Sequence, residues 1–157
     1  MSNDLLIATF IGHRDASLSL NGRKKLKAII EKVIASGVKT FWCGAHGSFD
    51  GACASILKEL KEYYLDLKVY VVSPYFSEHY LRELNRLVDN GYYDGIILPP
   101  IEAIPPKYAI LARNKYMIDH CCALISYVNA TFGGAYTAYK YAKRKPEITV
   151  FNLGILA

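Results

Sequence analysis

Three turns in the sequence carry the glycines that an anion-binding site needs. Each follows an apolar run of strand length, and they contain Gly12, Gly44 with Gly47, and Gly133 with Gly134. Where a strand passes into a helix through glycines, the first backbone N–H groups of the helix are free and no side chain blocks a phosphate or a carboxylate. A turn that needs glycine only for its dihedral angles is the alternative at each place.

Two polar side chains follow the first of these turns directly. Arg14 could grip a phosphate or a carboxylate through two N–H groups, or it could pair with Asp15 at the surface. Its position beside Gly12 favours the ligand. His13 could donate to the same ligand or only brace the turn, and both roles stay open.

Asp50 lies in the second turn, just before a predicted helix. Its carboxylate could bind a sugar hydroxyl, although capping the helix is the simpler role, and both can be true of one loop. Thr137 falls in the first turn of the last predicted helix, where its hydroxyl could add a donor to the backbone N–H groups. An ordinary first-turn threonine is the alternative there.

Arg113, Asn114 and Asp119 belong to a predicted helix that precedes an apolar strand. The pair Arg113-Asn114 is either exposed or turned toward the ligand. Asp119 lies at the end of the helix, where the helix dipole disfavours a carboxylate, so we expect it to have a specific partner. Arg113 and Asp119 fall on different faces of the helix because six residues separate them.

The composition argues against several classes of partner. A net charge of +5 over 157 residues is mild, and the basic clusters Arg23-Lys24-Lys25 and Lys143-Arg144-Lys145 are short, which argues against a nucleic-acid partner. The four cysteines form no CxxC pair, so we expect reduced, buried thiols and no metal. We expect no cofactor either. No signal peptide or membrane-spanning run is evident, which predicts a soluble cytoplasmic protein without membrane contact.

Apolar periodicity predicts the elements that must position these residues. Strands are expected over residues 5–11, 38–43, 67–72, 121–128 and 147–151, with a short strand possible over 96–98. Helices are expected over residues 20–36, 52–64, 77–90 and 107–119, and from residue 135 onward. Pro99 and Pro100 make the strand over 96–98 hard to extend as a central one.

Strands that alternate with helices indicate an α/β fold. We expect a Rossmann-like three-layer sandwich, with a mostly parallel central sheet of about five strands, in a single domain over residues 1–157. Ligands of such sheets bind beyond the carboxyl ends of the strands, near a switch in strand order. All three glycine turns should open at that edge, which favours a common site.

In this order the motifs resemble those of the SLOG superfamily of Rossmann-like proteins, most closely its YpsA-like branch. Three of the matching motifs follow the first three predicted strands: Gly12-His13-Arg14, Gly44 to Gly51, and Ser73-Pro74-Tyr75. A fourth, Arg113-Asn114-x-x-Met117-Ile118-Asp119, lies within the predicted helix over 107–119. The last, Gly133-Gly134 with Thr137, follows the predicted strand over 121–128. The resemblance implies a pocket for a nucleotide or a nucleotide-derived ligand at the glycine turns. It also implies a homo-oligomer.

Relatives in this superfamily include the LOG phosphoribohydrolases, which cleave a base from ribose 5-phosphate. They use the arginine of an RKxxM motif and the glutamate of a PGGxGTxxE motif. Arg113 and Met117 match the first motif, with Asn114 in place of its lysine. In the second motif Gly133, Gly134 and Thr137 match. Phe132 replaces the proline, Tyr136 the third glycine and Lys140 the glutamate. The loss of that carboxylate argues against LOG-type hydrolysis and leaves anion binding intact.

Two functions remain open from the sequence. The first is the binding or sensing of a phosphate-bearing nucleotide at the glycine turns. The second is an N-glycosidic hydrolase in which Asp50 or Asp119 replaces the missing glutamate and Arg113 orients the substrate.

Overall fold

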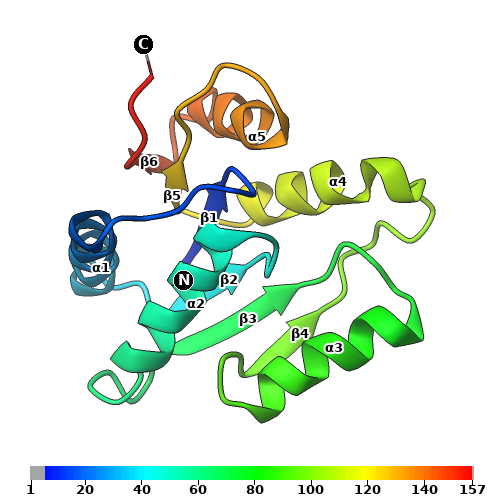
Figure 1. The fold of residues 1–157 in the computed structure, drawn as a ribbon, viewed down its shortest axis with the longest axis horizontal. Coiled ribbons are helices and arrows are strands. Elements are labelled where there is room, and N and C mark those ends of the chain that lie inside the picture. Colours follow the sequence, from blue (N-terminus) through cyan, green and yellow to red (C-terminus); the bar gives the residue numbers. More distant parts are fainter. Residues whose placement is uncertain (1–5, 157) are drawn as a thin grey trace, which may run out of the picture.

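The structure, a computed structural model, describes residues 6–156 as strands and helices in alternation (Figure 1). Leu5, where the first strand was expected to begin, lies outside these residues. The elements in chain order are β1 (Ile7–Gly12), α1 (Leu20–Ala35), β2 (Thr40–Cys43), α2 (Ser48–Leu60), β3 (Lys68–Val72), α3 (Glu78–Asp89), β4 (Gly95–Ile97), α4 (Pro106–Asp119), β5 (Ala123–Tyr127), α5 (Gly134–Lys143) and β6 (Thr149–Asn152).

All strands are parallel and lie in the order β4-β3-β2-β1-β5-β6. The chain first adds strands on one side of β1 and then, from β5, on the other. The switch in strand order therefore falls between β1 and β5. The α/β fold is confirmed, with a sheet of six strands within residues 6–156 where about five were expected, because Gly95–Ile97 pairs with β3. This short strand lies at the edge of the sheet, where the prolines that follow it do not interrupt a ladder.

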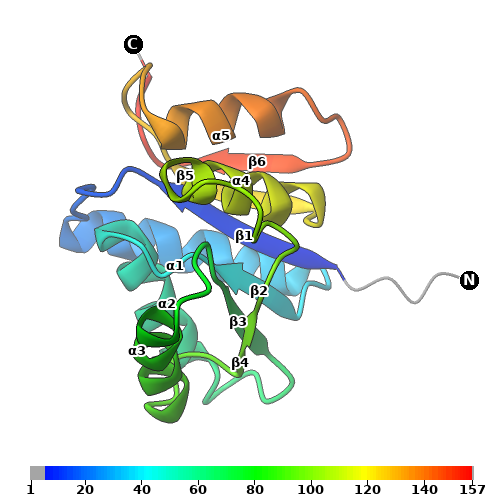
Figure 2. The ribbon, with the colours of Figure 1, turned by 90° about the vertical axis from the view of Figure 1, so that its right-hand side faces the viewer.

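The sheet lies between two layers of helices (Figure 2). Successive strand residues point to opposite faces, so Phe10 packs toward α1, α2 and α3 while its neighbour Ile11 packs toward α4 and α5. Met117 of α4 and Ala138 of α5 complete the second layer. No helix among residues 6–156 combines the length and the apolar character needed to cross a membrane.

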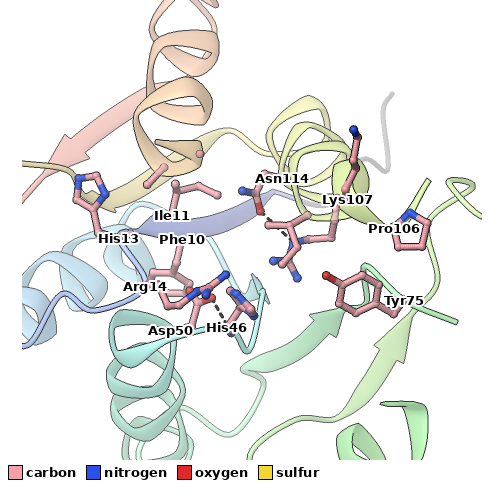
Figure 3. Close-up of a pocket in the computed structure, with 15 residues that line it drawn as sticks. Phe10, Ile11, His13, Arg14, His46, Asp50, Tyr75, Pro106, Lys107 and Asn114 are labelled. Atoms are coloured by element: carbon pink, nitrogen blue, oxygen red, sulfur yellow. Dashed lines mark hydrogen bonds between the residues drawn. The ribbon is translucent and has the colours of Figure 1, made fainter. Parts of the chain in front are cut away.

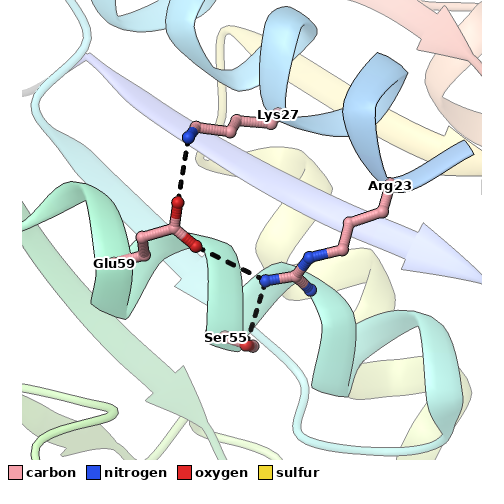
Figure 4. Close-up of polar contacts among 4 residues, drawn as sticks. All are labelled: Arg23, Lys27, Ser55 and Glu59. Atoms are coloured by element: carbon pink, nitrogen blue, oxygen red, sulfur yellow. Dashed lines mark hydrogen bonds and ion pairs between the residues drawn. The ribbon is translucent and has the colours of Figure 1, made fainter. Parts of the chain in front are cut away.

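Helices α1 and α2 are also joined at the surface by Glu59 (Figure 4). The Glu59 carboxylate accepts a hydrogen bond from Lys27 Nζ at 2.9 Å and lies 3.6 Å from Arg23 Nη2. Arg23 donates in addition to the hydroxyl of Ser55. Exposed pairs of this kind contribute less than about 1 kcal/mol each. They partly neutralise the first of the two basic clusters.

Helix α2 differs from its predicted bounds of 52–64. It begins at Ser48, because Gly47 adopts a φ of 97° and acts as the N-cap residue, and it ends at Leu60. A side chain at Gly47 would also collide with the backbone of Arg14, only 2.6 Å away. The early start places Asp50 inside the first turn of the helix, which matters for the site.

Candidate functional site

A cavity of about 310 Å³ opens at the carboxyl end of β1, beside the switch in strand order (Figure 3). The start of α2, the first turns of α4 and the start of α5 form its walls. The structure brings seven of the predicted site residues to this cavity: Gly12, His13, Arg14, Asp50, Arg113, Asn114 and Gly134. The expectation that the glycine turns meet at one edge of the sheet therefore agrees with this arrangement.

Arg113 lies at the back of the cavity and is only 2% exposed. Its Nη1 donates to the carbonyl oxygens of Gly44 and Val72, each at 2.9 Å, and its Nε donates to Asn114 Oδ1 at 2.9 Å. These bonds leave Nη2 without a partner among residues 6–156. Burial lowers the pKa of Arg113, and the Asp50 carboxyl opposes that shift. A buried cation with unused N–H groups on a cavity favours an anionic or strongly polar ligand.

Asp50 is the carboxylate of this cavity and is 7% exposed. The expectation that it caps α2 is wrong, because Gly47 occupies the cap position and Asp50 follows in the first turn. Its Oδ2 instead accepts the backbone N–H of His46 at 2.9 Å. Burial raises the pKa of Asp50 to about 6, while Arg113 and the bond from His46 oppose the rise.

His46 also borders the cavity, on the turn between β2 and α2. Its Nε2 is buried and has no hydrogen-bond partner among the described residues. Burial, then Arg14 and Arg113, lower the pKa of His46, so the ring is neutral at pH 7. The preceding Ala45 has a φ of 52°, a left-handed conformation that costs a non-glycine residue about 1 kcal/mol. Strain of this kind is found at ligand sites, where the surrounding structure holds it in place.

His13 both braces a turn and borders the cavity. Its backbone N–H donates to Tyr127 O at 3.2 Å, and its Nε2 accepts the N–H of Asn129 at 3.3 Å. Because Nε2 is the acceptor in this bond, Nδ1 carries a proton and can donate to a ligand. Arg14 is exposed on the other side of the opening, and it forms no ion pair with Asp15 among residues 6–156.

The start of α5 supplies backbone donors to the same opening. Gly133 is its N-cap residue, with a φ of 90° and no side-chain cap. The first hydrogen bond within the helix runs from Thr137 N–H to Gly133 O, so the N–H groups of Gly134, Ala135 and Tyr136 have no partner inside the helix. Gly134 and Ala135 line the cavity. These donors at the positive end of the helix dipole suit a phosphate.

Gly44, Gly47 and Gly133 support the cavity without lining it. A side chain at Gly44 would lie 2.9 Å from Asp50 Oδ2 and 3.1 Å from Arg113 Nη2, so glycine lets these two groups approach each other. Gly47 packs against Arg14, whose carbonyl accepts Ser48 N–H at 2.9 Å.

Two predicted site residues lie elsewhere. The Thr137 hydroxyl donates back to Gly133 O, and its side chain lines a separate groove with Leu111 and Tyr141. Asp119 ends α4 at the opposite edge of the sheet, where Tyr141 donates to it and Lys145 lies 3.4 Å away. Asp119 therefore has specific partners, as expected, but these contacts join α4 to α5 and the segment after it, and the Asp119 side chain does not line the cavity.

The sequence did not single out Tyr75 and Lys107 as ligand residues, yet both line the cavity. Tyr75 belongs to the turn after β3, and Lys107 to the first turn of α4. The feature of the sequence that could have identified them is the one that identified the predicted site residues. Each lies where a strand or helix meets a loop at the carboxyl edge of the sheet.

Cys43, Cys53 and Cys121 are buried free thiols, and Cys122 is partly buried. Burial raises the pKa of Cys43 and Cys53, with a smaller contribution from the nearby Asp50. Among residues 6–156 no group of three histidine, cysteine or acidic side chains is placed to hold a metal ion.

An all-parallel open sheet with helices on both faces and a cavity at the switch point define a Rossmann-like architecture. Neither a family model nor a curated protein matches the chain. Among solved structures the chain is similar to DNA processing protein A (DprA) from Streptococcus pneumoniae, with a TM-score of 0.63 and 18% identity over 94% of this chain and 50% of that one. The chain thus spans half the length of that protein. At this identity the likeness shows the fold alone.

Proposed function

We propose that the chain binds a phosphate-bearing nucleotide or nucleotide-derived ligand in the cavity beside β1. The observation that carries this proposal is the charge of the cavity wall. Arg14, Lys107 and Arg113 line it, and Asp50 is the one carboxylate among its lining residues. Low-dielectric walls strengthen the attraction of such a set of cations for an anion.

The two ends of the cavity suit different parts of a nucleotide. His13 and the free N–H groups of α5 form one end, where a phosphate would meet donors and a positive helix dipole. Tyr75 and Pro106 lie at the other end with Lys107 beside them (Figure 3), and the ring of Tyr75 suits a planar base. A volume of about 310 Å³ is at the small end of ligand pockets and fits one nucleotide better than a dinucleotide.

Nucleotide N-glycosidic hydrolysis is the alternative, and one observation favours it. Asp50 is a buried carboxylate at the cavity, and its pKa is raised to about 6, the range that suits a general acid or base. Asp119, the other replacement considered for the glutamate of LOG enzymes, lies at the far edge. Lys140, in the position of that glutamate, is exposed and lies with its Nζ 4.9 Å from the centre of the Tyr136 ring.

Several finer expectations belong to the same proposal. We place the chain nearest the YpsA-like branch of the SLOG superfamily, on the motifs given above, and expect a cytoplasmic homo-oligomer. DprA is named for DNA processing, so a DNA partner is the competing possibility. Ion pairs of Arg23 with Glu59 and of Lys145 with Asp119 neutralise part of both basic clusters, which supports a small molecule instead.

Calorimetric titration tests the proposal. AMP, GMP, CMP and UMP are compared with the corresponding nucleosides, and inorganic phosphate is added as a competitor. We expect at least one monophosphate to bind, its nucleoside to bind at least about tenfold more weakly because a charged contact is lost, and phosphate to compete. Arg14→Ala should weaken the binding of the monophosphate. The proposal fails if no phosphate-bearing compound binds. Release of free base on incubation would establish the hydrolase.

A further inference from the structure

The two oxygens of the Asp50 carboxylate have different surroundings. Oδ2 accepts the backbone N–H of His46 at 2.9 Å. Oδ1 has no hydrogen-bond partner among residues 6–156, although the side chain is more than nine-tenths buried and lines the cavity. Because Asp50 lines the cavity, its Oδ1 can accept a hydrogen bond from a group that the ligand brings.

The guanidinium of Arg113 lies close to this carboxylate. Asp50 Oδ2 and Arg113 Nη2 are 2.9 and 3.1 Å from one point, the place where a Cβ on Gly44 would stand. Nη2 is the part of Arg113 not used by its bonds to the backbone and to Asn114. Asp50 and Arg113 therefore border the same point, and Oδ1 and Nη2 both have no hydrogen-bond partner among residues 6–156.

This combination selects the chemistry of its ligand group. A phosphate oxygen can accept from Arg113, but it would be repelled by the Asp50 carboxylate. An ammonium can donate to Asp50, but Arg14, Lys107 and Arg113 would repel it. A hydroxyl donates with its hydrogen and accepts with its oxygen, so it satisfies both groups at once.

The position of the pair within the cavity indicates which hydroxyl this is. Asp50 and His46 lie between His13 on one side and Tyr75 on the other (Figure 3). With the phosphate at the α5 end and the base at Tyr75, the sugar lies over Asp50. We propose that Asp50 and Arg113 bind the ribose hydroxyls, and that the cavity therefore selects ribonucleotides over deoxyribonucleotides. This inference rests on the proposed function.

The experiment compares each ribonucleoside monophosphate with its 2′-deoxy and 3′-deoxy counterparts by calorimetry. We expect removal of at least one hydroxyl to weaken binding about tenfold to a hundredfold, the loss expected for one hydrogen bond to a charged group. Equal affinities of ribo and both deoxy compounds would overturn the inference and leave the proposed function standing. Absence of binding by every monophosphate would overturn both.

Asp50→Asn tests the residue itself. The amide oxygen can still accept His46 N–H, which leaves an NH₂ group at the position of Oδ1, where no hydroxyl proton can be accepted. We expect the variant to prefer ribo over deoxy compounds markedly less than the wild type does, because only the donors of Arg113 and the new amide remain for the hydroxyl. Asp89→Asn, an exposed change at the end of α3, is the control and should keep the wild-type ratio. A preserved ratio in Asp50→Asn would contradict the assignment, and thermal melting establishes that both variants are folded.

Discussion

Arg113 and Gly44 are 69 residues apart in the sequence, yet Nη1 of the arginine donates to the glycine carbonyl at 2.9 Å. The same nitrogen donates to Val72 O. One side chain of α4 therefore holds the ends of β2 and β3 in place while part of its guanidinium remains for a ligand. Stability and binding should both depend on this residue.

We expect Arg113→Met to lower the free energy of unfolding by about 2–5 kcal/mol, because the carbonyls of Gly44 and Val72 both lose a buried donor. Ligand binding should be lost as well. Urea denaturation at pH 7 measures the first effect. Arg86→Met is the control, since Arg86 is exposed and forms its surface ion pair with Glu83, and it should change stability by less than about 0.5 kcal/mol. Equal stability of the two variants would contradict the structural role of Arg113.

Gly12 and Gly51 offer a matched test of packing at the site. A Cβ on Gly12 would lie 2.4–2.7 Å from carbons of the Phe49 side chain, whereas a Cβ on Gly51 meets nothing within 4 Å. Gly12→Ala should therefore destabilise the fold by about 1–3 kcal/mol through overpacking. Gly51→Ala, inside α2, should stabilise it by up to about 1 kcal/mol through helix propensity. Thermal melting of both variants measures these changes in stability. A Gly12→Ala variant as stable as the wild type would contradict the close contact with Phe49.

Gly133 and Gly91 share a left-handed backbone, with φ of 90° and 84°, but Gly133 caps α5 while Gly91 follows α3. Alanine at either position should cost about 1–2 kcal/mol of stability. Nucleotide affinity should fall about fivefold in Gly133→Ala alone, because the strain displaces the first N–H groups of α5. Calorimetry on both variants separates the two effects. A similar loss of affinity in Gly91→Ala would show that strain, and not the donors, was responsible.

The buried carboxyl of Asp50 should make stability depend on pH in an unusual direction. Its pKa is about 6 in the folded chain against an ordinary value of 3.8, so the folded state holds the proton more tightly. Stability should therefore fall as the pH rises from about 4 to about 6, by about 2–3 kcal/mol, and level off above. The lowered pKa of His46 acts in the opposite sense, since it adds stability as the pH rises toward 6.5.

Comparison with Asp50→Asn isolates the carboxyl from other titrating groups. Urea denaturation at pH steps from 4 to 7 should show the variant gaining stability relative to the wild type as the pH rises. Parallel curves for the two proteins would show that Asp50 has an ordinary pKa.

The sequence predicts the sheet and the edge that holds the site because both depend on local patterns. Apolar runs ending in glycine, such as Phe10 to Gly12, identify a strand and its turn without any knowledge of distant contacts. The parallel arrangement then brings the turns to a common edge. The sequence therefore predicts that Arg14, Asp50 and Gly134 lie near one another, as they do in the cavity.

The remaining site depends on contacts between distant segments and on the rotation of each helix. Thr137 lies one turn beyond Gly133, yet the packing of Ala138 and Ala142 on the sheet turns its side chain toward Leu111 and away from the cavity. Asp119 has its partner on α5, in Tyr141, which no local pattern reveals.

The central strand β1 pairs with β2 on one side and with β5 on the other. During synthesis, the segment through Ile97 could already assemble the four strands β1 to β4 beneath α1, α2 and α3. One edge of β1 and the opposite face of the sheet would stay bare until α4, β5 and α5 had left the ribosome. A nascent chain should therefore acquire its affinity for ligand in one late step, and arrest peptides that report force along the emerging polypeptide would detect it.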